Sequence, residues 1–537
     1  MPELSQPTQK LISRYQDWYQ SLQPKEGVSS TIHVDEVASK VASFYEKLRG
    51  IVDWREEHLM RRAAISRMLK RRLLLSKDAK TIAEPLILES IRGGHFPNDK
   101  IPESNIEEVK KVIGKYIFIL QNSPAPPKEK LKPQFTNWLL DIATCEIEEV
   151  LSPSKRERAL IDYMMESMKE SVKLKEASVI VFGGMSEEEK NIQTYIAIQR
   201  ALFKLDSPII TYHLLKKQYS RWTDLPLFQL QEITQNIYLI LDNLEKELNH
   251  PLAEKFYNVC ERYDTSYLLL GDILSEGSTG EIAEKISKPE ILEELIKKAY
   301  NKRLSTLKKR LSRAAIYSTL SILLTNALSL YVLEVPLAKL ITGTFRPITI
   351  IVDILGPTFL MFLLTVTIKL PSKSNLQAVI METMKIVYQR EKVDIYQIKV
   401  SKKRGIIVKS LIALLYLISA LISLAVIAVI FQRAGFPPTS VVINIIFVAL
   451  VAFAGLAIRN RAKELTVEET KTSFIGSLFD AIFLPVVGLG RWLSNKWKKY
   501  NAIAIFFTAL IDMPFELFVE FFEQWRFFLK EKKEEIH

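Results

Sequence analysis

The chain is poor in the residues that most often build metal sites, disulfides and tight turns. Its 537 residues include only 2 cysteines, 6 histidines and 18 glycines. Cys145 and Cys260 are too few for a disulfide framework or for a structural zinc site of the usual four ligands. We therefore expect two buried free thiols in a reducing compartment. The scarcity of glycine, beside abundant Leu, Ile, Lys and Glu, favours helix throughout.

The short signatures of common catalytic and nucleotide-binding sites are also missing. The sequence has no GxxxxGK[ST] loop, no HExxH or CxxC motif and no GxSxG elbow. The histidines are scattered without metal-like spacing, and the cluster Glu146, Glu148 and Glu149 is typical of a solvated helix face. We predict no catalytic residue, no cofactor and no metal site, and we do not expect an enzyme.

Alternating apolar and polar residues joined by hairpin turns, the pattern of β-sheets, are absent as well. The sequence therefore predicts an all-α fold. The clearest helical signal in the polar N-terminal half has apolar residues spaced by three and four positions, which is typical of a coiled coil. These apolar positions are Val34, Val37, Val41, Phe44, Leu48 and Ile51.

The predicted continuation of this helix carries a strongly basic side. A basic amphipathic helix can lie on anionic lipid headgroups or bind phosphate-rich partners. The alternative is a solvated face of a packed helical bundle. The basic residues of this candidate lipid-binding or partner-binding face are Arg61, Arg62, Arg67, Lys70, Arg71 and Arg72.

Long hydrophobic runs are confined to the last two-fifths of the chain. A helix needs roughly 20 mostly apolar residues to cross a hydrocarbon layer about 30 Å thick. Four segments meet this requirement and predict a multi-pass integral membrane protein. They cover about residues 314–334, 347–368, 406–431 and 439–458.

Breaks rich in Pro, Gly and Asn divide the remainder of the chain. From Pro289 to Pro336, by contrast, no Pro or Gly interrupts the sequence, which predicts one long helix that begins in the cytoplasm and becomes the first span. We therefore expect four parts: a helical subdomain over 1–123, a second cytoplasmic helical subdomain over 124–300, a transmembrane domain over 301–465 and tail helices over 466–537.

The distribution of charge predicts the orientation of the chain in the membrane. Basic residues gather before the first span, between the second and third, and after the fourth, whereas the other connections hold only Lys339, Arg346 and Arg433. The positive-inside rule then places both termini in the cytoplasm. The net charge of +12 is better explained by a bilayer with anionic lipid headgroups than by nucleic acid. Neither a signal-peptide core nor an organelle-targeting stretch is visible, so we expect a bacterial plasma membrane.

The tail contains two further apolar stretches, Phe474–Gly490 and Ala502–Phe522, joined by a basic and aromatic segment. Two more spans would place this basic join outside, against the charge rule. We therefore predict interfacial or re-entrant helices, with true spans as the alternative.

The predicted spans contain one carboxylate, Asp353, and two amides, Asn326 and Asn444. A charge near the bilayer centre costs roughly 2.5–3.5 kcal/mol on insertion scales, so such a residue usually faces other helices or water. These three residues form a candidate intramembrane polar site. It would act as a proton or cation relay, or merely as polar glue between helices.

Three functions remain open, of which the third, an enzyme acting at the membrane, would need a site assembled from residues far apart in the sequence. The first is a membrane-anchored helical scaffold or adaptor whose cytoplasmic bundle binds a protein partner or the lipid surface. The second is a transporter or channel subunit that uses Asp353. Because four spans enclose little space by themselves, the second function requires a homo-oligomer or the tail helices.

Overall fold

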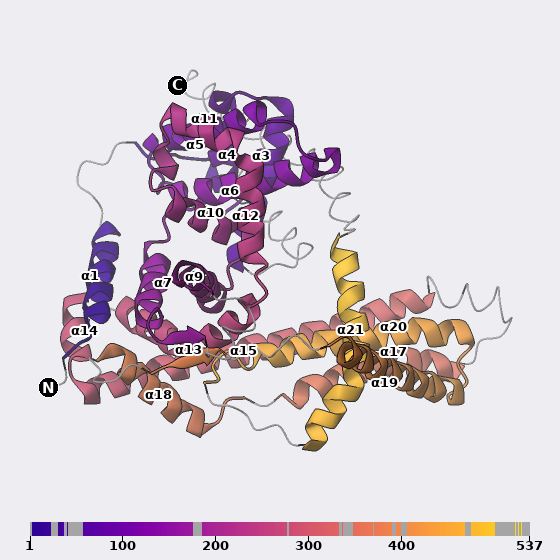
Figure 1. Cartoon of the computed structure of the whole chain (residues 1–537). Coiled ribbons are helices and arrows are strands. Elements are labelled where there is room, and N and C mark those ends of the chain that lie inside the picture. The colour runs from indigo at the N-terminus through magenta and orange to yellow at the C-terminus, as the bar shows by residue number, and fades with distance from the viewer. Residues whose placement is uncertain are drawn as a thin grey trace, which may run out of the picture. The chain divides into compact units, whose positions relative to one another are not determined.

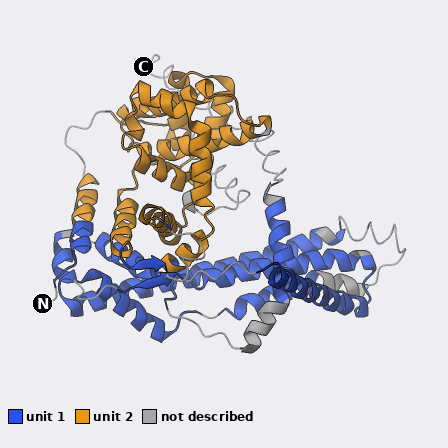
Figure 2. Ribbon diagram, viewed as in Figure 1, with its two compact units in different colours: residues 1–12, 170–185, 261–501 blue, residues 13–169, 186–260, 502–537 orange. Residues whose placement is uncertain are grey.

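The computed structural model describes residues 3–22, 30–36, 57–174, 185–276, 279–331, 347–368, 370–388, 394–398, 405–467 and 474–499, with a few isolated positions besides. These residues are helical almost throughout (Figure 1), which confirms the all-α prediction. The chain forms two compact units (Figure 2). Unit 1 comprises Met1–Ile12, Glu170–Met185 and Glu261–Asn501, and unit 2 comprises Ser13–Lys169, Ser186–Cys260 and Ala502–His537.

Unit 2 is a bundle of short helices. Two helices, α1 (Gln6–Ser21) and α13 (Ala253–Ser275), contribute residues to both units. The helices that lie wholly in unit 2 are α3 (Glu57–Leu75), α4 (Ala79–Arg92), α5 (Ser104–Asn122), α6 (Lys132–Leu151), α7 (Lys155–Met168), α9 (Glu187–Phe203), α10 (Ser207–Gln218), α11 (Leu227–Gln235) and α12 (Ile237–Leu248), with short 3-10 turns η1 (Glu129–Leu131) and η2 (Trp222–Asp224).

Local chemistry explains several of these helix boundaries. The hydroxyl of Ser186 accepts a hydrogen bond from the Glu189 N–H at 3.0 Å and starts α9. Asp78 caps α4 in the same way, accepting from the Lys80 N–H at 3.0 Å. At its other end, α9 stops where Lys204 adopts a left-handed conformation, with φ of 50°.

One hydrophobic core holds unit 2 together. Its buried side chains extend from Ile32 to Leu248 and come from both sides of residue 123, where the sequence suggested a change of subdomain. Val34, the first position of the predicted coiled-coil seam, is buried in this core. The other positions of the seam lie outside the described residues.

A polar network is enclosed in this core and corrects one prediction. Glu146 was expected on a solvated face, but it is fully buried. The Nζ of Lys115 donates to both of its carboxylate oxygens at 2.6 and 2.8 Å, and Tyr116 and Trp222 donate to Oε2 at 2.7 and 3.1 Å. Glu148 is mostly buried as well. These carboxylates are tolerated inside because every one has charged or hydrogen-bonding neighbours.

Unit 1 contains longer and more apolar helices. Within it, β1 (Val172–Leu174) pairs in parallel with β2 (Tyr396–Ile398), a small strand pair that the sequence did not indicate. Its helices are α14 (Thr279–Ile286), α15 (Pro289–Ser329), α17 (Pro347–Val366), α18 (Lys373–Val387), α19 (Ile406–Arg433), α20 (Pro438–Arg461) and α21 (Phe474–Lys499). The long helix predicted from Pro289 is present as α15, with 41 residues.

Two helices among the described residues are long and apolar enough to cross a membrane, Ile406–Arg433 and Ser440–Arg461. The structure therefore supports two of the four predicted spans. The C-terminal half of α15 is diluted by hydroxyl and amide side chains, such as Thr325 and Asn326. In α17 the side chains before Ile354 are outside the description, and the remaining apolar stretch, Ile354–Val366, is short.

Glycines allow close contacts between the apolar helices of unit 1. A methyl group added at Gly455 of α20 would lie 2.7 Å from the Leu364 side chain of α17, and one at Gly490 of α21 would clash with the carbonyl oxygen of Ala449. The absence of a Cβ at these positions lets the backbones approach, as in membrane helix pairs. The segment predicted as a join, from Arg491 onward, continues α21 without a break.

Candidate functional site

The basic residues of α3 are bound largely to acidic residues of their own unit. Arg62 donates to Asp206 at 2.6 Å, and its Nε lies 3.3 Å from Glu148. Arg71 and Arg72 share Glu89, at 2.5 and 2.7 Å.

The remaining basic side chains of this face are also engaged. Lys70 lies 3.0 Å from Asp141, Arg61 lies 3.8 Å from Glu148, and Arg67 takes part in further interactions. The charge of this face is therefore compensated within the unit. Binding of lipid or of a partner by these residues stays a prediction.

The intramembrane polar residues lie on helices that pack against one another. Helices α15, α17 and α20 are mutual neighbours in unit 1. Asn326 of α15 is 3% exposed, and neither its Nδ2 nor its Oδ1 has a hydrogen-bond partner among the residues that the structure describes. Asn444 of α20 is also buried, and its Nδ2 donates to the Ser440 carbonyl at 3.1 Å. The side chain of Asp353 lies outside the described residues.

Helix geometry relates the positions of Asp353 and Asn444. Gly455 of α20 meets Leu364 of α17, and each polar position precedes its contact residue by eleven positions in the sequence. Eleven residues are roughly three turns, so each polar position lies on the contact face of its helix.

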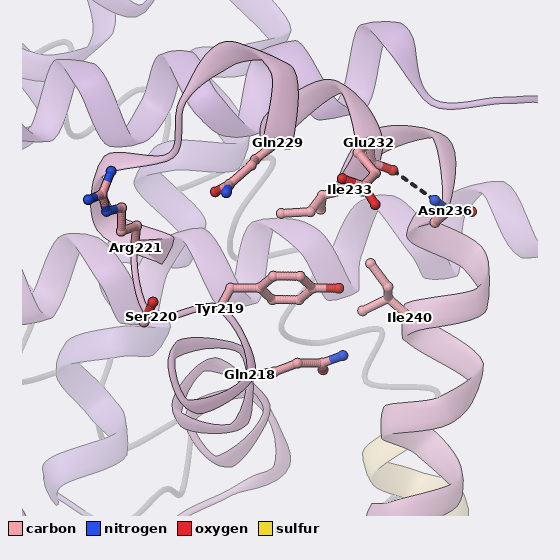
Figure 3. A pocket seen from close by; sticks show the side chains of 9 residues that line it. All are labelled: Gln218, Tyr219, Ser220, Arg221, Gln229, Glu232, Ile233, Asn236 and Ile240. Carbon is pink, nitrogen blue, oxygen red and sulfur yellow. Dashed lines mark hydrogen bonds between the residues drawn. The ribbon is translucent and has the colours of Figure 1, made fainter.

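Unit 2 has a pocket of about 330 Å³ around Tyr219, at the junction of α10, η2, α11 and α12 (Figure 3). We call it the Tyr219 pocket. In Figure 3 the Tyr219 ring extends across the pocket, and the side chains of Gln229 and Ile233 reach toward it from above. The lining residues are Gln218, Tyr219, Ser220, Arg221, Gln229, Glu232, Ile233, Asn236 and Ile240.

The lining of the Tyr219 pocket offers hydrogen-bond donors and acceptors in close proximity. Gln218 and Gln229 carry amides that both donate and accept. Burial, followed by the neighbouring charge of Glu232, raises the pKa of Tyr219 above its ordinary value, so its hydroxyl keeps its proton. Beside Gln229, the side chains of Leu227 and Phe228 are 63% and 65% exposed. A polar pocket with exposed apolar neighbours suits an amphipathic ligand better than a small ion.

The Tyr219 pocket could not be recognised from the sequence, because its residues are ordinary polar types in a segment without a motif. Its only signal was the adjacent Leu227–Phe228 pair, which follows Pro226 at the start of a helix.

The thiols are as predicted, with Cys145 and Cys260 both buried and free. Within the described ranges, no three His, Cys, Asp or Glu side chains come together as a metal site would require. No known protein family, curated protein or solved structure matches this chain.

Proposed function

We propose that the chain is a membrane-anchored helical adaptor, held in the bilayer by its C-terminal helices and recruiting a protein partner through unit 2. The observation that carries the proposal is the contrast between two exposed surfaces. The apolar helices of unit 1 present rows of large hydrophobic side chains outward, whereas unit 2 exposes such side chains at few places.

Exposed apolar side chains support four spans rather than two. On α19, only 11% of the most apolar stretch is buried. The C-terminal half of α15 and the second half of α17 share this property, with outward side chains such as Leu324 and Phe359. Apolar surface of this extent is stable only in contact with lipid or another apolar partner. We therefore propose α15, α17, α19 and α20 as the four spans.

The tail helix α21 fits a re-entrant arrangement. It contacts α19 at Tyr416 and α20 at Ala449, both far from the ends of those helices. A helix lying at the headgroup level would meet the ends of the spans instead.

Cysteine labelling tests the orientation with both termini in a bacterial cytoplasm. Single cysteines at Gln432, before the turn between α19 and α20, and at Lys463, after α20, report opposite sides. A membrane-impermeant maleimide applied to intact cells should label Gln432→Cys and spare Lys463→Cys. Cys145 and Cys260 are buried and give little background. Labelling of both engineered cysteines, or of Lys463→Cys alone, would contradict this topology.

The Tyr219 pocket, with Leu227 and Phe228, is the proposed docking site. Its side-chain amides suit the N–H and C=O groups of an extended peptide, and the exposed apolar pair suits one hydrophobic side chain of that peptide. We infer that the partner presents a linear segment of this kind.

Variant-dependent cross-linking tests the docking site in the full-length protein. A photoreactive residue at Gln229 should capture one partner reproducibly. Phe228→Asp should abolish this capture, while Leu74→Asp, which charges an even more exposed apolar site outside the pocket, should leave it intact. Equal capture by both variants, or by neither, would contradict docking at this pocket.

A transporter or channel subunit is the second candidate function, and Asn326 is the observation that favours it. A buried amide without a partner costs free energy that a passing ion, proton carrier or water would recover. Loss of ion flux in reconstituted vesicles on Asp353→Asn would support it, and unchanged flux in that variant would remove its main support.

A further inference from the structure

A second pocket of unit 2, with a volume of about 410 Å³, has a different character from the Tyr219 pocket. It is formed by α1, α3, α6, α10 and the first turn of α7. We call it the α7 pocket. Nothing in the proposed adaptor function uses it, so the following inference stands independently of that function.

The first turn of α7 is an open site for an anion. Its N-cap residue Ser154 makes no side-chain capping hydrogen bond within the described residues, and Arg158 is the first residue whose N–H bonds back, to the Ser154 carbonyl at 3.0 Å. The N–H groups of the three preceding positions therefore point out of the helix unpaired, where the helix dipole is positive. Two of these three residues also have basic side chains. Lys155 has no ion-pair partner within the described part of the chain, and the Arg156 guanidinium lies 5.5 Å from the ring centroid of Trp18.

The lining of the α7 pocket also contains a buried histidine with one nitrogen unused. His213 is 7% exposed and lines the pocket. Its Nδ1 lies 2.5 Å from the amide oxygen Oε1 of Gln199, which only accepts, so Nδ1 carries the proton and donates. Burial, followed by the charge of Arg158, lowers the pKa of His213 to about 3. The ring is neutral at pH 7, and Nε2 presents a lone pair with no partner among the residues described.

The acidic groups of the pocket are mostly neutralised. Glu149 pairs with Arg158 and with Lys216, the latter at 2.9 Å, and Glu148 lies against Arg62. Glu157, in the first turn of α7, lacks such a partner within the ranges that the structure covers. The negative charge of Glu157 weakens the attraction of the pocket for an anion. Removing this charge should therefore strengthen anion binding.

We propose that the α7 pocket binds a small phosphorylated ligand that also carries a hydroxyl group, such as a sugar or polyol phosphomonoester. The phosphate accepts hydrogen bonds from the free N–H groups of α7 and is attracted by Lys155 and Arg156. The hydroxyl group donates to Nε2 of His213. The same chemistry is offered by a free sugar phosphate and by a phosphorylated inositol lipid headgroup.

Phosphorus NMR on the full-length protein in maltoside detergent tests the phosphate site, with inorganic phosphate as the probe. We expect saturable line broadening with a millimolar Kd. Lys155→Met combined with Arg156→Met should weaken binding at least tenfold, and Glu157→Gln should strengthen it several-fold. The pair Lys128→Met and Lys132→Met changes the net charge equally at another surface and serves as control. Equal weakening by both pairs, or no saturable broadening, would overturn the proposal.

Competition distinguishes the two sources and tests the role of His213. Glucose 6-phosphate and a short-chain phosphatidylinositol 4-phosphate are each titrated against inorganic phosphate. If one of them binds more tightly than inorganic phosphate, it identifies the source of the ligand. His213→Phe should then reduce the affinity for that compound to the affinity for inorganic phosphate, while the affinity for inorganic phosphate itself stays unchanged. If neither exceeds inorganic phosphate, the hydroxyl contact with His213 is refuted.

Discussion

The core of unit 2 and the apolar helices of unit 1 arrange polar and apolar side chains in opposite ways. In unit 2 the interior is largely hydrophobic, and its fully buried carboxylate, Glu146, accepts hydrogen bonds from Lys115 and Tyr116. In unit 1 the large hydrophobic side chains of α19 face outward, while amides such as Asn326 and Asn444 are inside. The same helical propensity serves both units, and the opposite arrangement is what we expect if water surrounds unit 2 and lipid surrounds unit 1, as proposed above.

The largest effect is expected from breaking the buried ion pair of unit 2. Glu146→Leu leaves the ammonium group of Lys115 buried without its counter-charge, which should lower the free energy of unfolding by about 3–5 kcal/mol. Urea unfolding of the full-length protein in detergent measures this change. The double variant Lys115→Met with Glu146→Leu should recover most of the loss. A double variant as unstable as the single one would show that the pair is not the source of the effect.

A slightly smaller effect is expected where the helices of unit 1 touch through glycine. Gly490→Ala forces a methyl group against the Ala449 carbonyl, and we expect a loss of about 1–3 kcal/mol, seen as a lower thermal midpoint in detergent. Gly356→Ala is the matched control, because nothing lies within 4 Å of its added methyl group. Similar midpoints for the two variants would contradict the packing of α21 on α20.

The buried histidine of unit 2 predicts a pH dependence. The folded pKa of His213, about 3, is below the unfolded value of about 6.5, so the unfolded state takes up the proton first. The corresponding stability is complete above pH 6.5 and is lost as the pH falls toward 3. At pH 5 the loss is about 2 kcal/mol. His213→Gln should show a correspondingly smaller difference between pH 7.5 and pH 5 in urea unfolding, and an unchanged difference would contradict the assignment.

The smallest effect on stability is expected from replacing buried amide side chains of unit 1. One amide, Asn326, has no hydrogen-bond partner among the described residues, whereas the other, Asn375, has several. Asn326→Leu replaces an amide without a partner and should raise stability by about 1 kcal/mol. Asn375→Leu should lower it, because this amide donates to Tyr300 and to the Leu465 carbonyl at 3.0 and 2.6 Å. Thermal midpoints in detergent measure both. If Asn326→Leu is as damaging as Asn375→Leu, Asn326 has a functional partner, which favours the transporter candidate.

Features encoded by neighbouring residues were predictable from the sequence. The Ser186 cap, the uninterrupted helix from Pro289 and the apolar stretches that became α19 and α20 each depend on a local pattern. Their residue spacing is sufficient because helix formation and capping are short-range effects.

Features that depend on distant partners were not predictable. Glu146 looked solvated beside two other glutamates, yet its partners Lys115 and Trp222 come from segments 31 and 76 residues away. The strand pair joins segments more than two hundred residues apart, and the α7 pocket combines five helices. The spacing of residues along the chain gives no sign of such pairings.

Because α15 is uninterrupted, the number of residues between its two halves sets the direction in which the apolar surface of its second half faces. Its first half is fixed by Arg303, which pairs with Asp272, and by Tyr300, which accepts a hydrogen bond from Asn375, whereas its second half presents an apolar surface. Each residue of a helix turns the next by about 100°. A single alanine inserted between the two halves would therefore swing the apolar surface about a quarter of the way around the axis, while seven would nearly restore it.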